Sequence, residues 1–284
     1  MIAPPSEFRG LDEIVARALE EDLGSPPRDL TSEAVIDQGA AGAGEIRAGS
    51  SLVLAGLEAA RRTFRAMGSE VSFTPCSDEG ARLGPGAVVA RIEGPLRVIL
   101  GGERTALNFL QRLSGIATHT ARFVKEVQGT NARILDTRKT TPGWRELEKH
   151  AVRCGGGANH RMGLYDAILI KDNHVRAAGG TAKAIDRARR LAPEASMEVE
   201  VQCIPELEEA LAAGAPRILL DNMDVSALRK AVAVTAGRAS LEASGGVTLE
   251  TVRAVAETGV DFISIGALTH SAPAVDLSLE VTKP

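Results

Sequence analysis

The stretch Met197–Asn222, MEVEVQCIPELEEALAAGAPRILLDN, sets the pattern for the second half of the chain. Two strand-like apolar runs, Met197–Gln202 and Ile218–Asn222, lie on either side of a helical stretch, Pro205–Ala213. A strand, a helix and a second strand in this order indicate two parallel strands joined by a right-handed crossover.

The same alternation extends in both directions, from about residue 130 to residue 266. Further strand-like runs are Arg133–Thr137, Ala167–Lys171, Ser240–Ser244 and Phe262–Gly266, and further helical stretches are Trp144–Cys154, Ala182–Leu191, Val225–Ala236 and Leu249–Glu257. Six nearly continuous apolar runs predict a sheet that is buried on both faces. An open doubly wound sheet would fit this pattern, but the polar residues that end every strand favour a closed or nearly closed barrel.

The part of the chain before residue 130 is less regular. Helical spacing predicts helices over 11–22, 57–67, 96–113 and 118–127, and loose alternation predicts strands over 44–56, 71–75 and 87–92. We expect an α/β fold with two domains, residues 1–114 and 115–271. A return of the tail 272–284 to the first domain is compatible with this division.

The composition excludes several classes of protein. Hydrophobic residues make up 44% of the 284-residue chain and aromatic residues only 3%, and the net charge is -4. A general nucleic-acid binder is usually basic, so this charge argues against that class. No secretory signal or membrane span is recognisable, and the three scattered cysteines fit a reducing compartment. We therefore expect a cytoplasmic protein that binds neither nucleic acid nor membranes.

Basic side chains gather near the ends of the first two predicted strands. Between Arg133 and Arg176, nine Lys or Arg stand against five Asp or Glu, which gives +4 in a chain of net charge -4. Basic groups that converge in a partly desolvated pocket bind carboxylates or phosphates. The predicted cationic subsite consists of Arg138, Lys139, His160, Arg161 and Lys171. His174 follows Lys171 closely, and bracing of its own loop is as good an interpretation as ligand binding.

The later strand ends carry small and acidic residues. Ser244, Gly245 and Gly246, followed on the next strand by Gly266 and Ala267, match the phosphate site after the last strands of many barrels. Glu200 and Asp221 end adjacent strands and can coordinate Mg²⁺ on a diphosphate, hold ribose hydroxyls or stabilise positive charge at a sugar carbon. Glu198 has the same strand parity as Glu200, so either can instead be a structural ion-pair partner. Arg104 has the pattern of an ordinary surface arginine.

Three long motifs resemble the quinolinate phosphoribosyltransferase family. They are DTRKTTPG at 136–143, AVRCGGGANHRMG at 151–163 and ILIKDNHV at 168–175. The resemblance implies an N-terminal α/β sandwich domain, an incomplete TIM-like α/β barrel and a homodimer. It also implies Mg²⁺-dependent transfer of a phosphoribosyl group from 5-phosphoribosyl 1-diphosphate to quinolinate. Loss of CO₂ then gives nicotinate mononucleotide on the de novo route to NAD.

The resemblance also implies residue roles. Arg138, His160, Arg161 and Lys171 hold the quinolinate carboxylates, beside Thr137, and Lys139 reaches toward the diphosphate. Glu200 and Asp221 face the ribose and metal, and residues 244–246 with Gly266 and Ala267 hold the 5-phosphate. Arg104 enters the site of the other subunit. On this basis we expect Lys139, Lys171, Glu200 and Asp221 to be the catalytic residues.

Three other functions are weighed against this one. The phosphoribosyltransferase-like proteins of molybdenum transport share the DTRKTTPG run. A Schiff-base aldolase can use a strand-end lysine such as Lys171 as its nucleophile; the cationic surroundings argue against this only if Lys171 pairs with a carboxylate. A non-catalytic anion-binding protein would leave Glu200 and Asp221 without a clear use.

Overall fold

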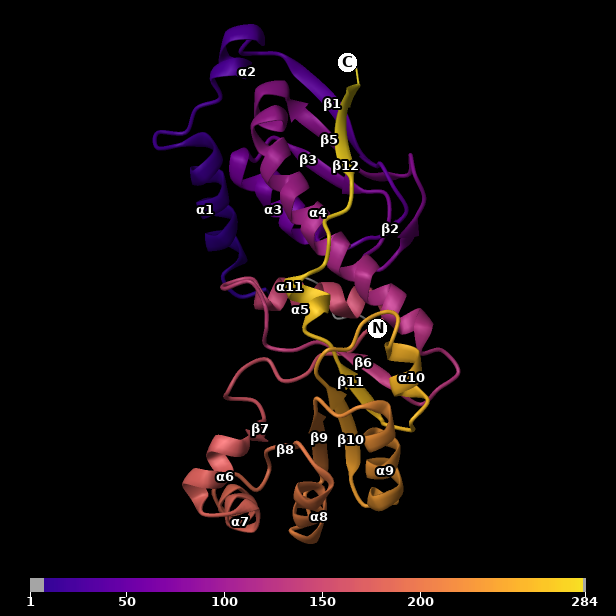
Figure 1. The fold of residues 1–284 in the computed structure, drawn as a ribbon. Coiled ribbons are helices and arrows are strands. Elements are labelled where there is room, and N and C mark those ends of the chain that lie inside the picture. Colours follow the sequence, from indigo (N-terminus) through magenta and orange to yellow (C-terminus); the bar gives the residue numbers. More distant parts are fainter. Residues whose placement is uncertain (1–7, 283–284) are drawn as a thin grey trace. The chain divides into compact units, whose positions relative to one another are not determined.

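The computed structural model describes residues 8–282, and the chain forms two compact units (Figure 1). The first unit contains the residues up to Ala121, the segment Thr141–Gly156 and the residues from Ser271 on. The second contains Arg122–Thr140 and Gly157–His270. The sequence pattern placed the domain boundary after residue 114 and allowed the tail 272–284 to join the first domain; the first compact unit contains the residues from Ser271 on.

The first unit is built on an antiparallel sheet with strand order β12-β1-β5-β3. Its strands are β1 (Ala41–Ala48), β3 (Ser72–Pro75), β5 (Val88–Pro95) and β12 (Leu277–Thr282), and β2 (Leu52–Val53) pairs separately with β4 (Arg82–Leu83). Its helices are α1 (Leu11–Leu23), α2 (Leu30–Val35), α3 (Leu57–Met67), most of α4 (Leu96–Glu126) and α5 (Arg145–Cys154). Ile46, Phe64 and Ile92 lie in the hydrophobic core that these elements enclose.

The C-terminal segment completes the sheet of this unit. In Figure 1 the yellow β12 runs beside the indigo β1, and the two strands pair from Ala48–Leu277 to Ala43–Thr282. A few residues earlier, Pro273 lies so close to α4 that a Cβ on Gly115 would sit 2.2 Å from its carbonyl oxygen. The close approach therefore requires glycine at this point of the helix.

Three elements of the first unit differ from the sequence-based expectation. Helices over 96–113 and 118–127 are one helix, α4, because Gly115 serves the contact with Pro273 and does not end the helix. The strand over 44–56 is divided into β1 and β2, where Gly49 donates its N–H to the carbonyl of Asp276. Helix α2 was not predicted. Its N-cap residue is Asp29, whose side chain accepts the N–H groups of Thr31 and Ser32.

Long-range contacts explain why Thr141–Gly156 belongs to the first unit. The ring of Trp144 stacks on Phe109 of α4 with centroids 4.7 Å apart. Arg112, also on α4, forms an ion pair of 3.0 Å with the fully buried Glu148 of α5. These contacts connect segments that the regular strand-helix pattern had assigned to different domains.

The second unit contains a six-stranded parallel sheet with order β6-β11-β10-β9-β8-β7. The strands are β6 (Arg133–Leu135), β7 (Ile168–Ile170), β8 (Met197–Val201), β9 (Arg217–Asp221), β10 (Ser240–Ser244) and β11 (Phe262–Ser264). The helices are α6 (Asp172–Ala178), α7 (Thr181–Leu191), α8 (Ile204–Ala212), α9 (Val225–Thr235), α10 (Val252–Ala256) and α11 (Ala267–His270). Helix α7 packs on β7, α8 on β8 and α10 on β11.

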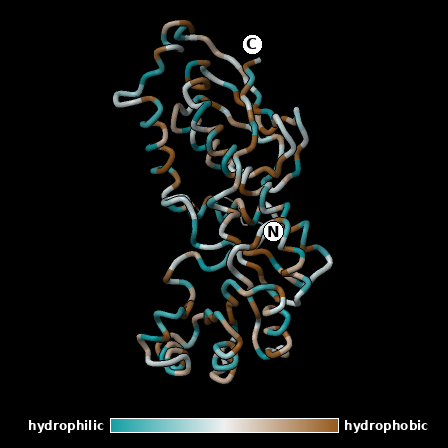
Figure 2. Tube along the Cα trace, viewed as in Figure 1, coloured by the Kyte–Doolittle hydropathy of each residue, from teal (hydrophilic) through white to brown (hydrophobic). Residues whose placement is uncertain are grey.

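This sheet is an incomplete barrel. Strands β6 and β7 are its two edges, and no pairing joins them among residues 8–282. A single parallel bridge between Leu135 and Ala158 extends the β6 edge. The prediction of a barrel that is not fully closed is therefore confirmed. Figure 2 shows that hydrophobic and hydrophilic residues alternate along the helices that cover the sheet.

Membrane-spanning helices are absent from residues 8–282: no helix there combines sufficient length with sufficient apolar character. The 31-residue α4 is long enough but carries charged residues along its length.

Candidate active site

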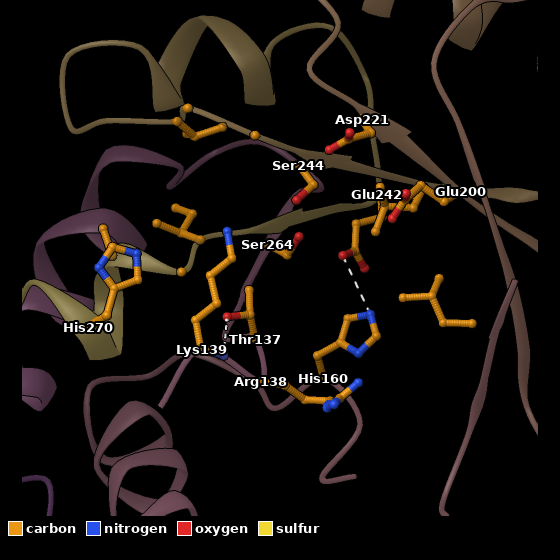
Figure 3. A pocket seen from close by; sticks show the side chains of 18 of the residues that line it. Thr137, Arg138, Lys139, His160, Glu200, Asp221, Glu242, Ser244, Ser264 and His270 are labelled. Carbon is orange, nitrogen blue, oxygen red and sulfur yellow. Dashed lines mark hydrogen bonds and ion pairs between the residues drawn. The ribbon is translucent and has the colours of Figure 1, made fainter. Parts of the chain in front are cut away.

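A cavity of about 480 Å³ opens at the C-terminal ends of the parallel strands of the second unit. Figure 3 shows side chains from several strand ends pointing into it. Its lining includes every site residue predicted from the sequence except Arg104, which is exposed on α4 of the first unit. The predicted residues in the lining are Thr137, Arg138, Lys139, His160, Arg161, Lys171, Glu200, Asp221, Ser244, Gly245, Gly246, Gly266 and Ala267.

Arg161 is the best-placed group for binding a carboxylate. Its Nη1 donates to the carbonyl of Ala167 at 3.0 Å, which orients the guanidinium. Burial lowers the pKa of Arg161 below its ordinary value, and the positive charge of Arg138 lowers it further. Two arginines this close together repel each other, so an anion bound between them would be stabilised by both.

Hydrogen bonds to the Asp136 carboxylate hold the turn that carries His160. Asp136 is fully buried, and its carboxylate accepts the backbone N–H of His160 at 2.9 Å and the side-chain amide of Asn159. Asp136 therefore has a structural role, because it connects the end of β6 to the segment that precedes β7.

Lys139 is held at both of its backbone polar groups. Its N–H donates to Thr137 Oγ1 at 3.0 Å, and its carbonyl accepts from Thr269 Oγ1 at 2.7 Å. The lysine side chain extends across the cavity (Figure 3) and passes Gly266, where an added Cβ would lie 3.0 Å from Lys139 Cδ. Glycine at 266 therefore leaves room for this lysine.

The loop after β10 requires glycine for two different reasons. Gly245 has φ +100°, and a Cβ there would lie 2.2 Å from Asn222 Oδ1. Gly246 has φ +62° but open space around it. Asn222 itself has φ +55° and donates its N–H to Ser244 O at 2.8 Å. The loops after β9 and β10 are thus locked together, with small residues facing the cavity.

Two acidic groups of the predicted site have different partners. Glu200 Oε2 accepts from Lys171 Nζ at 2.6 Å, while Asp221 Oδ2 accepts from Asn222 Nδ2 at 3.0 Å. Each carboxylate keeps a second oxygen, and both line the cavity. Carboxylate oxygens are ligands that Mg²⁺ accepts, usually together with water and substrate phosphate oxygens. The residues therefore fit a magnesium ion bound mainly through a substrate.

His174 and Glu198 both make contacts with other protein groups, and His174 lines a second cavity together with Arg161. His174 is not in the lining of the first cavity, and its Nδ1 accepts the N–H of Lys171 at 2.9 Å, so it braces its own loop. Glu198 is buried one step below Glu200 on β8 and pairs with His160 and Arg217.

Four polar residues of the lining were missed by sequence reasoning: Glu242, Thr248, Ser264 and His270. Glu242 precedes Ser244 by two residues on β10, so strand alternation could have placed it on the inner face.

An α/β-barrel protein with an anion-binding mouth is the class that this fold and cavity define. Comparison with known proteins narrows the class to one family. Residues 29–114 match the model described as quinolinate phosphoribosyl transferase, N-terminal domain, and residues 116–280 match the model of its C-terminal domain. The chain belongs to this quinolinate phosphoribosyl transferase family.

Similar proteins cover nearly the whole chain. The probable nicotinate-nucleotide pyrophosphorylase [carboxylating] of Bacillus subtilis is 44% identical over 92% of this chain and 90% of its own length. The nicotinate-nucleotide pyrophosphorylase [carboxylating] of Mycobacterium leprae is 41% identical over 97% and 98%. Among solved structures, nicotinate-nucleotide pyrophosphorylase from Francisella tularensis is 38% identical, with a TM-score of 0.91 over 96% of both chains.

Proposed function

We propose that this protein transfers the phosphoribosyl group of 5-phosphoribosyl 1-diphosphate to quinolinate and releases CO₂, diphosphate and nicotinate mononucleotide. One observation carries the proposal. A single cavity of about 480 Å³ is lined by a cationic wall, a glycine loop and a pair of carboxylates. The two substrates need these three surfaces, and the names of the similar proteins agree with this chemistry.

The cationic wall binds quinolinate in this proposal. Arg161 and Arg138 supply planar guanidinium groups that suit carboxylates, and Lys171 adds a point charge. The N–H groups and small side chains of 244–246, with Gly266 and Ala267, take the 5-phosphate. Lys139 neutralises the diphosphate as it leaves.

The reaction requires alignment and electrostatic stabilisation from the protein. The lone pair of the pyridine nitrogen forms the new bond to the anomeric carbon as the bond to the diphosphate oxygen breaks. The carbon passes through an oxocarbenium-like state that Glu200 and Asp221 stabilise. The nucleophile carries no proton, so no strong general base is needed. As CO₂ leaves, the electron pair of the bond to the 2-carboxylate stays on ring C2, where the adjacent positive nitrogen stabilises it, and this pair then binds a proton.

Magnesium fits the acidic edge of this site. Glu200 and Asp221 would hold the ion, which supplies positive charge to the diphosphate leaving group when bound.

The three cysteines are free of disulfides, in agreement with the reducing cytoplasm in which we place the reaction.

We further propose a homodimer in which Arg104 of the partner subunit completes the quinolinate pocket. Arg104 is exposed on α4. Arg104→Ala and Lys139→Ala should each be inactive alone, whereas a mixture of the two regains activity through dimers with one intact site. Failure of refolded mixtures to regain activity would count against a shared site.

Arg161→Ala tests the assignment of the two subsites. We expect quinolinate binding to weaken by about tenfold or more, because a charge-assisted pair contributes about 1.5–3 kcal/mol. Binding of 5-phosphoribosyl 1-diphosphate should stay within about twofold. Calorimetry with each ligand measures both, and equal losses would contradict the assignment.

A further inference from the structure

A buried ionic cluster adjoins the cavity, and two of its four residues, His160 and Glu242, line it. It is formed by Glu198 of β8, Arg217 of β9 and Glu242 of β10, together with His160. Figure 3 shows the contact between His160 and Glu242. The Nε of Arg217 lies 3.0 Å from Glu198 Oε1, its Nη2 pairs with Glu242, and its guanidinium stacks on the Phe262 ring at 4.1 Å. Glu198 and Glu242 are buried, whereas the Arg217 side chain is 28% exposed.

Both ring nitrogens of His160 are already bound by protein groups. Nδ1 accepts the backbone N–H of Arg161 at 2.7 Å, so this nitrogen carries no proton. The ring proton is therefore on Nε2, which donates to Glu198 Oε2 at 2.9 Å. Glu242 Oε1 lies 3.6 Å from the same nitrogen. His160 in this state is a neutral imidazole with no nitrogen left for a substrate carboxylate.

The contacts form a continuous line from the cluster to Arg161. Arg217 forms an ion pair with one oxygen of Glu198, the other oxygen contacts the imidazole, and the imidazole accepts the backbone N–H of Arg161. Asp136 supports the same turn by accepting the N–H of His160. An arginine that must present its guanidinium to an anion beside Arg138 gains from a fixed backbone, because less ordering remains to be done on binding.

We propose that Glu198 and His160 are positioning residues that hold Arg161 for quinolinate, and that His160 forms no hydrogen bond of its own to the substrate. This inference rests on the proposed function in naming quinolinate as the ligand. It changes the role that family resemblance gives to His160, from binding a carboxylate to supporting the residue that binds it.

The state of the His160 ring is measured independently of any substrate. The ¹⁵N chemical shifts of histidine-labelled protein report which ring nitrogen is protonated, and His160→Asn identifies the His160 signals by their loss. At about pH 7.5 we expect an unprotonated Nδ1 and a protonated Nε2. A doubly protonated ring, or a proton on Nδ1, would overturn the inference.

The effect on binding separates positioning from a general structural role. Glu198→Ala should weaken quinolinate binding by about tenfold, as removal of an outer-shell partner does at metal sites. Binding of 5-phosphoribosyl 1-diphosphate should remain within about twofold. Glu198→Gln keeps an oxygen that accepts from Nε2 and should restore most of the affinity. The exposed Glu208→Ala on α8 is the matched control and should change neither ligand.

Folding failure of Glu198→Ala would not end the test. The triple variant Glu198→Met, Arg217→Met and Glu242→Met removes all three charges of the cluster together, which buried ionic groups usually tolerate, and still releases His160. Wild-type affinity for quinolinate in this variant, or equal losses for both ligands, would overturn the inference. If the wild type neither binds nor converts quinolinate, the proposed function fails, whereas the ring state measured by ¹⁵N stands or falls separately.

Discussion

The ammonium group of Lys171 lies 2.6 Å from a carboxylate oxygen of Glu200, at the ends of the neighbouring strands β7 and β8. Pairing of Lys171 with a carboxylate was the condition for rejecting a Schiff-base aldolase, and the pair with Glu200 meets it. A Schiff-base lysine must attack as the uncharged amine, and a carboxylate partner stabilises the ammonium form. The lysine side chain is 46% exposed, so the ion pair contributes little to folding stability. Its main effect is to keep Lys171 positively charged in the cavity.

Substitution of Lys171 distinguishes an ionic role from a covalent one. Lys171→Arg keeps the positive charge and should retain measurable quinolinate binding, whereas Lys171→Met should lose about tenfold or more. Borohydride treatment of the wild type with a sugar phosphate should leave its mass unchanged by mass spectrometry. A stable adduct on Lys171 would restore the aldolase interpretation.

The glycine loop offers a matched pair of substitutions. Gly246→Ala should cost about 1 kcal/mol of unfolding free energy, because a left-handed φ is accessible and the space is open. Gly245→Ala should cost at least about 2 kcal/mol, because its φ of +100° adds strain and Asn222 Oδ1 occupies the Cβ position. Urea unfolding measures both values. Equal losses for the two variants would contradict this prediction, because they would mean that the Asn222 side chain moves away from the added Cβ at little cost in free energy.

The buried Glu242 predicts a pH dependence of stability. Burial, and then the negative charge of Glu198, raises the pKa of Glu242 above its ordinary value of 4.5. The native state then holds this proton more tightly than the unfolded chain, so this stabilisation is lost as the pH rises toward the raised pKa. Glu242→Gln cannot lose the proton. Its unfolding free energy relative to wild type should therefore increase as the pH rises above 4.5 toward the raised pKa.

Glu250 serves as the control for this pH series. A hydrogen bond from Thr248 lowers the pKa of Glu250, so its contribution is complete above the ordinary value of 4.5 and is lost only in acid. The difference between Glu250→Gln and wild type should be constant over the same range. A constant difference for Glu242→Gln as well would contradict a change in the ionisation of Glu242 over this range.

The three cysteines should differ in reactivity. Cys154 is buried, and burial together with the nearby Glu79 carboxylate raises the pKa of its thiol well above the ordinary range. Cys76 and Cys203 are exposed. Iodoacetamide at neutral pH should label these two in the native protein and Cys154 only after unfolding, as peptide mass spectrometry can show. Native labelling of Cys154 would contradict its burial.

Periodicity predicted the parallel sheet because its strands are buried on both faces and form apolar runs in the sequence. It did not predict that Gly115 lies within one long helix, since the cause is a contact with Pro273 far along the chain. It also assigned residues 141–156 to the barrel. The stacking of Trp144 on Phe109, which places this segment in the first unit, is a tertiary contact that periodicity does not detect. Local signals cannot carry contacts between distant residues.

The candidate site was easier to predict than the fold around it. Strand ends of a parallel sheet converge, so taking them in order identified Arg138, Lys171 and Asp221 for one cavity. Depth within the barrel could not be predicted, and Glu198 and Glu200 could not be separated by parity alone. Their partners separate them: Glu198 contacts His160 and Arg217, and Glu200 contacts Lys171 at the mouth.

Release of labelled CO₂ tests the central claim most directly. The protein is incubated with 5-phosphoribosyl 1-diphosphate, Mg²⁺ and quinolinate labelled in its 2-carboxylate, and CO₂, diphosphate and nicotinate mononucleotide are measured together. We expect the three products in equal amounts, and none when either substrate is left out. Absence of nicotinate mononucleotide, or diphosphate release without labelled CO₂, would contradict the proposed function.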